Sequence, residues 1–351
     1  MDIIKRLQDV LDRSVESGEE CGCQLTVYRY GELFCDLVSG YTSADKTKKV
    51  DTKTLFPVFS VGKGVCTTMM LILKDQGKLD YDDLVVDFWD GYGVNGKEET
   101  TIRNVLSHRA GLYEVPPHFP FEDLYNWEKA CMLMQNGTPK DTIGGVHHYH
   151  GYTYGILTGR LAELADGRSF NQILKEEIVD PLGLDGMYFG INREQFDNNI
   201  AFLDATGHDP NDSRLTHNEF YLLNGMNPSS NGCINAHSLA KMYASLIGSG
   251  MDGIRLVSEK TIEEATVPCR APGDNDMRNW DRFGLGYALC GPLGNYGRMF
   301  GHGGACGAEG FADKETGYAI GFTKNKLNKT HPNHPTRNEI SKVLGLPERI
   351  W

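Results

Sequence analysis

The chain has 351 residues, of which 40% are hydrophobic and 23% are charged, a composition ordinary for a globular protein with a sizeable core. Its formal net charge is -12 and no basic stripe is present, which argues against nucleic acid as a partner. No apolar run reaches the length of a membrane span, so the sequence predicts no membrane partner either.

The first residues predict a helix and no secretory signal. Apolar residues at positions 3, 4, 7, 10 and 11 follow helical spacing, and charges interrupt every apolar stretch. Nine cysteines occur without a metal-type pattern, and the run His147-His148-Tyr149-His150 has no carboxylate or cysteine ligand beside it at a suitable spacing. We therefore expect reduced thiols, a cytoplasmic protein, and no metal or other cofactor.

Strand and helix patterns then alternate along the chain. Residues 23–29 and 33–39 alternate apolar and polar side chains around Tyr30-Gly31-Glu32, a pattern typical of a hairpin. Helical spacing follows in residues 127–134, 153–164, 170–179, 238–247 and 259–265. The tail is strand-like in residues 283–290, 298–302, 308–313 and 318–324, before a last predicted helix over residues 337–344.

This order of elements predicts an α+β fold of the α/β-sandwich type. One antiparallel sheet is built from the N- and C-terminal segments and flanked by helices, with a mainly helical subdomain inserted between them. We predict a single domain with a sheet lobe at about 1–64 and 235–351 and a helical lobe at about 65–234. A cleft is expected where the two lobes meet.

Ser60 and Lys63 form the pattern S-x-x-K at the head of the apolar run 65–73. In a helix that begins near Ser60, residues three apart share a face, so the hydroxyl and the amine become neighbours. Free N–H groups at the helix N-terminus would face an oxyanion formed at the serine. A hydroxyl nucleophile needs a base within reach, and a lysine whose ammonium is destabilised supplies one. The pattern therefore indicates a serine nucleophile for acyl transfer.

The same pattern has simpler explanations elsewhere in the chain. Ser43 and Lys46 lie in a polar stretch typical of a solvated loop. Ser238 is placed like a residue of a helix N-cap region, with Lys241 on a wet face. Even at Ser60, a capping serine followed by a solvated lysine would explain the pattern taken alone. Other segments must decide between the two interpretations.

Two further segments could converge on Ser60. Tyr149 precedes a predicted helix, where its phenol could face a cleft, although a core tyrosine anchored by its ring is the simpler interpretation. In residues 299–305 a predicted strand ends in a histidine and small residues, whose bare backbone can supply an N–H group to an oxyanion. A tight hairpin with glycines at positive φ explains this segment equally well.

Together these segments resemble the serine β-lactamase and penicillin-recognising family. The resemblance is greatest to its esterase branch, the family VIII carboxylesterases related to class C β-lactamases. Ser60-Val-Gly-Lys63 resembles the family's S-x-x-K, and Tyr149-His-Gly151 stands in the place of Y-x-N. Further along, the triplet at 302–304 replaces K-T-G. Residues 106–112 are similar to the H-x-x-G-L stretch and residues 228–232 to the P-x-x-x-G turn. The motifs occur in the family's order over about residues 20–325.

The resemblance implies that Ser60 is the nucleophile, with Lys63 and Tyr149 as the proton-transfer pair. It also implies an oxyanion hole made by the N–H groups of Ser60 and Ala305. For an acceptor to be available at pH 7, a pKa near 10 must fall by about 3, which corresponds to roughly 4 kcal/mol. The two groups titrate together, so the identity of the base stays open. The residues implied in substrate binding are Gly151, His302, Gly303 and Gly304.

Two departures from the family pattern bear on the substrate. Gly151 replaces the asparagine of Y-x-N, which removes an amide suited to the side-chain carbonyl of a β-lactam. His302 replaces the lysine of K-T-G and is expected to be neutral, which weakens recognition of a penicillin carboxylate. Both changes disfavour lactamase and transpeptidase activity. Glu309, near the expected cleft, could select cationic or neutral substrates, although a solvated carboxylate is the simpler interpretation and the one predicted.

These observations predict a serine hydrolase of the carboxylesterase type that cleaves small carboxylic esters through an acyl-enzyme on Ser60. Its expected partner is a small ester or amide, and homo-oligomerisation is left open. Acyl transfer to an alcohol, and β-lactamase or D-amino peptidase activity, would use the same acyl-enzyme. The alternative from another class is a catalytically idle scaffold, against which the intact trio of Ser60, Lys63 and Tyr149 argues.

Overall fold

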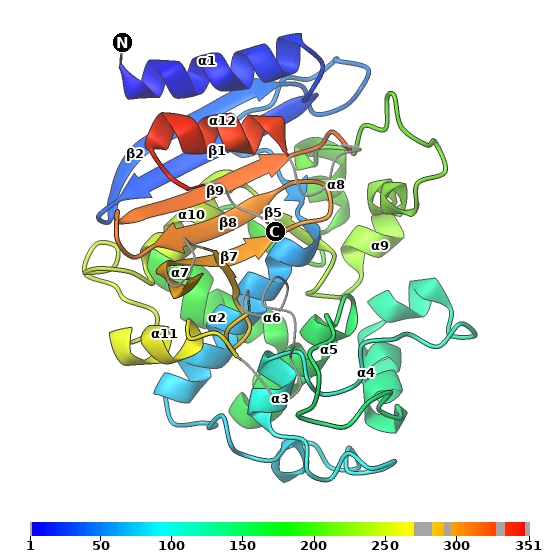
Figure 1. Ribbon diagram of the computed structural model, residues 1–351. Coiled ribbons are helices and arrows are strands. Elements are labelled where there is room, and N and C mark those ends of the chain that lie inside the picture. Colours follow the sequence, from blue (N-terminus) through cyan, green and yellow to red (C-terminus); the bar gives the residue numbers. More distant parts are fainter. Residues whose placement is uncertain (1, 270–282, 291–295, 328–333, 348–351) are drawn as a thin grey trace.

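The computed structural model describes residues 2–269, 283–290, 296–327 and 334–347. Within these residues, a six-stranded antiparallel sheet with the order β2-β1-β9-β8-β7-β6 lies between two layers of helices (Figure 1). The two ends of the chain build this sheet, as the sequence predicted, because β1 pairs with β2 on one side and with β9 on the other. The strands are β1 (Gly22–Arg29), β2 (Glu32–Gly40), β6 (Ala288–Cys290), β7 (Met299–Gly303), β8 (Glu309–Asp313) and β9 (Tyr318–Lys324).

The predicted hairpin is confirmed at β1 and β2. Arg29 pairs with Glu32, and both residues of the turn between them have positive φ, 52° at Tyr30 and 80° at Gly31. Such a turn matches the right-handed twist of the flanking strands, and glycine adopts its geometry without steric cost.

The helices α1 (Ile3–Glu16) and α12 (Pro335–Leu344) cover one face of the sheet and pack against each other (Figure 1). Leu7 and Leu11 from α1 and Ile340 from α12 are buried in a hydrophobic cluster that includes side chains of β1, β8 and β9. The Asp2 side chain accepts a hydrogen bond from the N–H of Ile4 and so caps α1.

The other face of the sheet contacts α10 (Ala236–Ala244), and behind it α2 (Gly62–Asp75) packs against α5 (Thr153–Asp166). The predicted helices at 127–134, 153–164 and 259–265 are confirmed as α4 (Trp127–Asn136), α5 and α11 (Glu259–Ala265). The predicted strand over 283–290 is wrong for its first part, because only β6 is extended there and Gly286 has a φ of 91°. The remaining helices are α3 (Ile102–Leu106), α6 (Phe170–Ile173), α7 (Asp180–Leu182), α8 (Arg193–Asn199) and α9 (Phe220–Asn224).

A second, small sheet with the order β3-β5-β4 lies next to the S-x-x-K segment. Its central strand β5 (Gly232–Ile234) pairs with β3 (Phe56–Pro57) and with β4 (Met187–Phe189). The N–H of Val58 extends this ladder by donating to the carbonyl of Gly232 at 2.9 Å. The chain is therefore held in register on the approach to Ser60.

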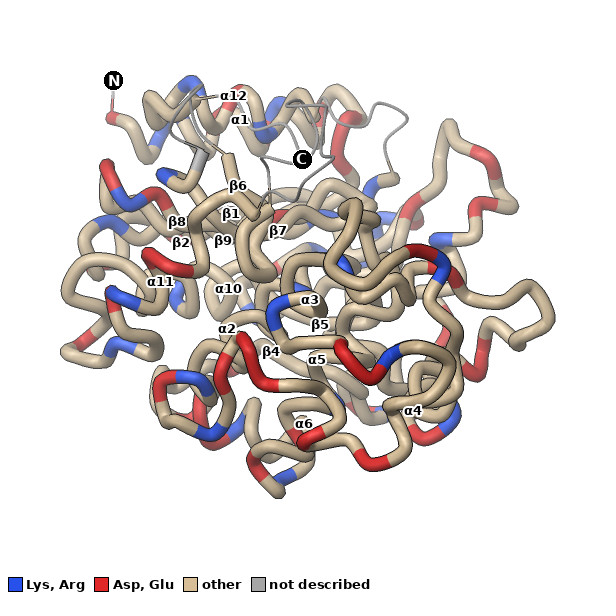
Figure 2. The backbone as a smooth tube through the Cα atoms, turned by 60° about the horizontal axis from the view of Figure 1, so that its bottom comes forward, with Lys and Arg blue, Asp and Glu red and all other residues tan. Residues whose placement is uncertain are grey.

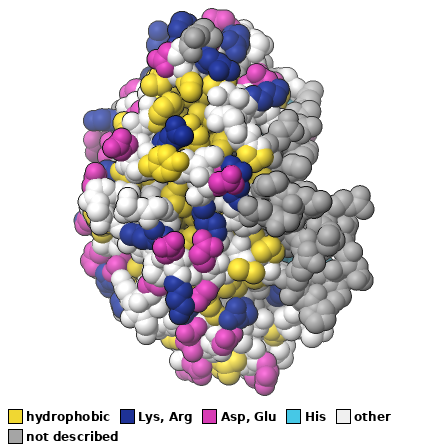
Figure 3. Space-filling view, turned by 60° about the vertical axis from the view of Figure 1, so that its left-hand side comes forward, with side chains coloured by type: hydrophobic (Ala, Val, Ile, Leu, Met, Phe, Trp, Pro, Cys, Tyr) yellow, Lys and Arg dark blue, Asp and Glu magenta, His cyan; other side chains and the backbone are white. Residues whose placement is uncertain are grey.

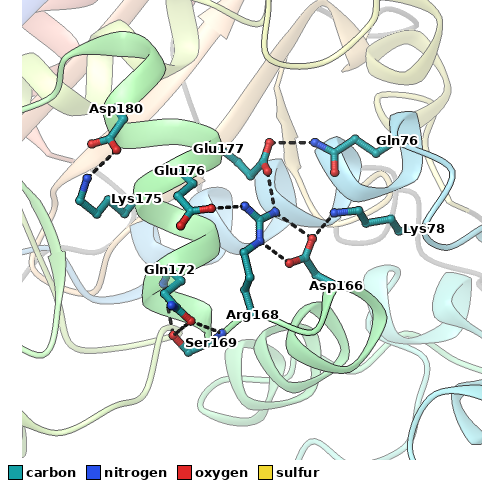
Figure 4. Close-up of polar contacts among 10 residues, drawn as sticks. All are labelled: Gln76, Lys78, Asp166, Arg168, Ser169, Gln172, Lys175, Glu176, Glu177 and Asp180. Carbon is teal, nitrogen blue, oxygen red and sulfur yellow. Dashed lines mark hydrogen bonds and ion pairs between the residues drawn. The ribbon is translucent and has the colours of Figure 1, made fainter.

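Ion pairs fasten the far end of α2 to its neighbours (Figure 4). Arg168 lies 2.5 Å from Asp166 at the end of α5 and 2.6 Å from both Glu176 and Glu177 in the π-helical turn Leu174–Val179. Lys78, just after α2, also pairs with Asp166, whose side chain is fully buried. These contacts fix the end of α2 opposite to Lys63.

Charges of both signs are interspersed over the molecule. Basic and acidic positions alternate along the backbone (Figure 2), and both kinds of side chain are mixed with apolar ones on the face shown in Figure 3. In the part of the chain that the structure describes, no helix combines the length and the apolar character needed to cross a membrane.

Candidate active site

Ser60 lies in a 3-10 turn, Phe59–Val61, that leads directly into α2. Phe59 has a φ of 52°, a left-handed conformation that costs a side-chain-bearing residue about 1–2 kcal/mol. The turn carries the chain sharply from β3 into the helix and leaves Ser60 half-buried, with its neighbours Phe59 and Val61 buried. Backbone strain at Phe59, directly before the partly accessible side chain of Ser60, is typical of functional sites.

Lys63 is fully buried in the first turn of α2. Its Nζ lies 2.9 Å from the Oγ of Ser60 and 3.1 Å from the carbonyl oxygen of Ser229, and it lies 4.9 Å from the ring centroid of Tyr149. The structure therefore brings Ser60, Lys63 and Tyr149 together from two distant segments. Among the described residues, the hydrogen-bond partners of this amine are the Ser60 hydroxyl and the Ser229 carbonyl, and no carboxylate forms an ion pair with it.

Burial lowers the pKa of Lys63 to about 7, because the ammonium is taken out of water without a counter-charge. The amine is therefore substantially neutral near pH 7 and can accept a proton. The pKa of the Tyr149 phenol is raised by desolvation, an effect that a hydrogen bond with Ser60 opposes. Since 39% of Tyr149 is still exposed, solvent moderates this shift, but its direction leaves the phenol protonated.

Three buried histidines, His108, His150 and His302, lie near this group, and burial lowers the pKa of each, so all are neutral at pH 7. Burial lowers the pKa of His150 to about 4 and that of His302 to about 3, with the Lys63 charge acting in the same direction. His150 donates from Nδ1 to the carbonyl of His148 at 2.6 Å and accepts at Nε2 from the N–H of Leu112 at 3.2 Å, which fixes its tautomer. These neutral rings give the amine no counter-charge.

The turn between β7 and β8 is pressed against the segment before Ser60. A Cβ on Gly304 would lie 2.2 Å from the carbonyl oxygen of Val58, so only glycine fits this close approach. Gly304 donates its own N–H to the carbonyl of Ala308 at 2.7 Å, and Ala305 is exposed at the tip of the turn. In the described part of the chain, the N–H groups of Ser60 and Ala305 donate to no backbone carbonyl.

The predicted substrate-binding residues differ in their surroundings. His302 and Gly303 end β7, and the His302 ring lies 6.0 Å from the ring of Tyr149. Gly151, two residues after Tyr149, adjoins open space, because a Cβ there would meet no atom within 4 Å. The described residues contain no group of three His, Cys, Asp or Glu side chains placed to hold a metal ion.

Sequence reasoning overlooked Ser229 although it flagged the P-x-x-x-G turn at 228–232. The carbonyl of Ser229 accepts the Lys63 hydrogen bond, and its Oγ accepts the N–H of Gly155 at 2.5 Å. That hydroxyl ties the turn to the start of α5, and so to the segment that carries Tyr149. The motif was visible in the sequence. The contact with Lys63 could not be predicted from it, because the partner is a backbone oxygen, which every residue type has.

The expectation for Glu309 is wrong. Its side chain is only 1% exposed and lies 3.4 Å from the guanidinium of Arg337 in α12. A carboxylate at the first position of β8 is buried here because the C-terminal helix brings a cation to it. Glu309 therefore does not face solvent in the cleft.

Comparisons with known proteins bear on the family and the fold. A family model described as Beta-lactamase matches residues 7–343. The esterase/β-lactamase LipL of Mycobacterium tuberculosis is 28% identical over 338 residues, covering 87% of this chain and 77% of LipL. A solved family VIII carboxylesterase has a TM-score of 0.87 at 25% identity, over 98% of this chain and 97% of that one. A penicillin-binding protein homologue from Caulobacter crescentus has a TM-score of 0.85 at 26% identity, again over 98% and 97%.

The fold is that of the serine hydrolases built on an antiparallel sheet with a helical insert, a class in which esterases and penicillin-binding proteins both occur. The chain belongs to the Beta-lactamase family. The resemblance inferred from the motifs is thereby confirmed.

Proposed function

We propose that this protein is a serine hydrolase of small, neutral carboxylic esters that works through an acyl-enzyme on Ser60. The observation that carries the proposal is a buried amine, with a pKa of about 7, lying 2.9 Å from a half-buried hydroxyl at a helix N-terminus. A relative named as an esterase and a similar structure named as a carboxylesterase support the ester as the substrate class.

In the first half of the reaction, neutral Lys63 takes the proton of Ser60 as Oγ attacks the ester carbonyl carbon. The carbonyl oxygen becomes an oxyanion and accepts hydrogen bonds from the N–H groups of Ser60 and Ala305. Collapse of this intermediate breaks the bond to the alcohol, and the proton returns to the leaving oxygen. Tyr149 is protonated and close to Ser60, so it relays that proton from Lys63 while taking none permanently. Water then repeats the sequence on the acyl-enzyme and releases the acid.

Preference for a neutral ester follows from two positions. His302 carries no charge at neutral pH, so it offers a substrate carboxylate no cation, and Gly151 offers no side-chain amide. A neutral ester needs neither group. A β-lactam or a peptide stem would lose both contacts.

The decisive experiment combines active-site labelling with turnover. The wild-type protein should react with a fluorophosphonate at Ser60 and hydrolyse short-chain p-nitrophenyl esters, and Ser60→Ala should abolish both. Ser43→Ala is the matched control, because Ser43 belongs to a second S-x-x-K pattern but lies in an exposed loop. Failure of the wild type to label or turn over would refute the enzyme, whereas nitrocefin hydrolysis as fast as ester hydrolysis would refute the substrate class.

A further inference from the structure

One short segment contacts both sides of the proposed oxyanion hole. The segment Asp212–His217 includes most of the 3-10 turn Ser213–Asn218. Arg214 donates from Nη1 to the carbonyl oxygen of Ala305 at 2.9 Å. At the other end, the buried His217 ring lies against the ring of Phe59, with centroids 4.2 Å apart. The two proposed N–H donors thus belong to Ala305 itself and to the residue after Phe59.

The segment is itself rigidly braced. Asp212 accepts from the backbone N–H of Arg214 at 2.9 Å and pairs with its guanidinium, with Nη2 and Oδ2 2.5 Å apart. The carbonyl of Arg214 in turn accepts a hydrogen bond from Nδ1 of His217 at 3.2 Å. Because Asp212 neutralises the guanidinium, Arg214 does not offer a free charge to an anionic substrate. Among the described residues, the other hydrogen bond of its guanidinium is the one to Ala305.

Ala305 and Phe59, the two residues that this segment contacts, both need such support. Ala305 is exposed in a turn that also contains Gly307 at a φ of 100°, so few side-chain contacts hold it. Phe59 has a left-handed backbone, a conformation that a residue with a side chain keeps only where its surroundings hold it. Oxyanion donors act through pre-organisation, and a displacement well below 1 Å removes much of their effect.

We propose that the segment Asp212–His217 positions the oxyanion hole, with Arg214 as the positioning residue that orients Ala305 and His217 as the one that holds Phe59. This inference rests on the proposed function. It means that the ion pair between Asp212 and Arg214, which is far from Ser60 and Ala305 in the sequence, influences the rate of the chemical steps.

Arg214→Met tests it, because methionine keeps the aliphatic length and removes the donor. Acylation and deacylation both pass through an oxyanion, so kcat should fall about tenfold while KM stays within about twofold, a fraction of the loss seen when a whole donor is deleted. Arg214→Lys, which retains a donor, should recover part of kcat. Arg193→Met is the matched control, since Arg193 is an exposed arginine paired with Asp197 at 2.9 Å.

Amide hydrogen exchange of residues 303–308 supplies a readout that does not depend on turnover. Exchange in this peptide should be faster in Arg214→Met than in the wild type and unchanged in Arg193→Met. Unchanged exchange, or a kcat within twofold of the wild type, would overturn the positioning role. Absence of Ser60-dependent turnover in the wild type would instead remove the proposed function, so the two failures are distinguishable.

Discussion

At the scale of single residues, the site depends on an amine that is buried without a partner charge. Holding an ammonium at the position of Lys63 costs on the order of 4 kcal/mol relative to water. The hydrogen bonds to Ser60 and to the Ser229 carbonyl satisfy the amine in its neutral form as well. Burial of Lys63 therefore lowers the stability of the folded protein near neutral pH and leaves the amine available as a proton acceptor.

The pH dependence of turnover should report this amine. With a Lys63 pKa of about 7, kcat/KM for an ester should rise about tenfold per pH unit below 7 and level off above it. The sign follows because the neutral form, which grows as pH rises, is the active one. The measurement is a pH–rate profile between pH 5 and 9. A rate that does not change over this range would contradict the assignment.

The same burial predicts an effect on stability. Between about pH 7 and the ordinary lysine pKa, the unfolded chain binds a proton that the folded protein does not, so the stability penalty is complete below pH 7 and fades as pH rises. Lys63→Met should lack turnover yet resist urea better than the wild type at pH 6. This advantage should shrink by roughly 2–3 kcal/mol at pH 9. An advantage that grows with pH would be inconsistent with a depressed lysine pKa.

At the scale of elements, α2 is held at both ends. Its N-terminus carries Lys63, and the ion-pair network around Arg168 fixes the other end (Figure 4). Asp166 is fully buried within this network, and hydrogen bonds from Arg168 and Lys78 hold the pKa of its carboxyl well below the usual range. A buried carboxylate of this kind stays ionised at little cost only while its cations are in place. Without them, the free energy of removing the charge from water is no longer offset, and the folded state is destabilised.

Arg168→Met should lower the free energy of unfolding by about 1–3 kcal/mol, a value moderated by the remaining pair between Lys78 and Asp166. The Asp166 contribution is present above its ordinary pKa and lost in acid, so the difference from the wild type should narrow below about pH 4. Urea unfolding at pH 7 and pH 3.5 measures both. Arg193→Met removes an exposed pair and should change stability by less than about 0.5 kcal/mol, and an equal loss in the two variants would count against the buried network.

At the scale of the whole molecule, the sheet separates two hydrophobic cores. The larger one lies on the α10 and α2 side, with the proposed catalytic residues, and the smaller one lies under α1 and α12. The C-terminal helix also brings Arg337 to Glu309, and the buried Lys324 pairs with Glu20 at 2.6 Å on the same side. The smaller core therefore contributes stability on the face of the sheet opposite to the proposed catalytic residues, so stability can be lowered there without changing the chemistry.

Leu11→Ala should separate these two properties. Leu11 is completely buried between α1 and the sheet, so the truncation should cost about 2–5 kcal/mol of unfolding free energy, while kcat of the folded enzyme stays unchanged. Ile3→Ala on the same helix, at a position 39% exposed, should cost less than about 1 kcal/mol. Urea unfolding and turnover at 20 °C provide the comparison. A fall in kcat while Leu11→Ala is still folded would show that the faces are coupled.

The sequence by itself determined the local elements, the family and the candidate residues. Periodicity located the hairpin at Tyr30-Gly31 and most helices, and the order of motifs pointed to Ser60, Lys63 and Tyr149. It failed where a neighbour from far along the chain decides the environment: Glu309 is buried by Arg337, and Ser229 contributes a backbone oxygen that no residue type reveals.

Only the tertiary structure decided how the two candidate proton acceptors, Lys63 and Tyr149, are protonated near pH 7. A lysine and a tyrosine have similar pKa values in water, and the identity of a residue does not tell how deeply its side chain is buried. Folding encloses Lys63 completely and leaves Tyr149 39% exposed with a protonated phenol, so the amine is the group with a pKa near 7. Electrostatic free energy depends on three-dimensional surroundings, which is why sequence supplied the candidates and the fold assigned their protonation.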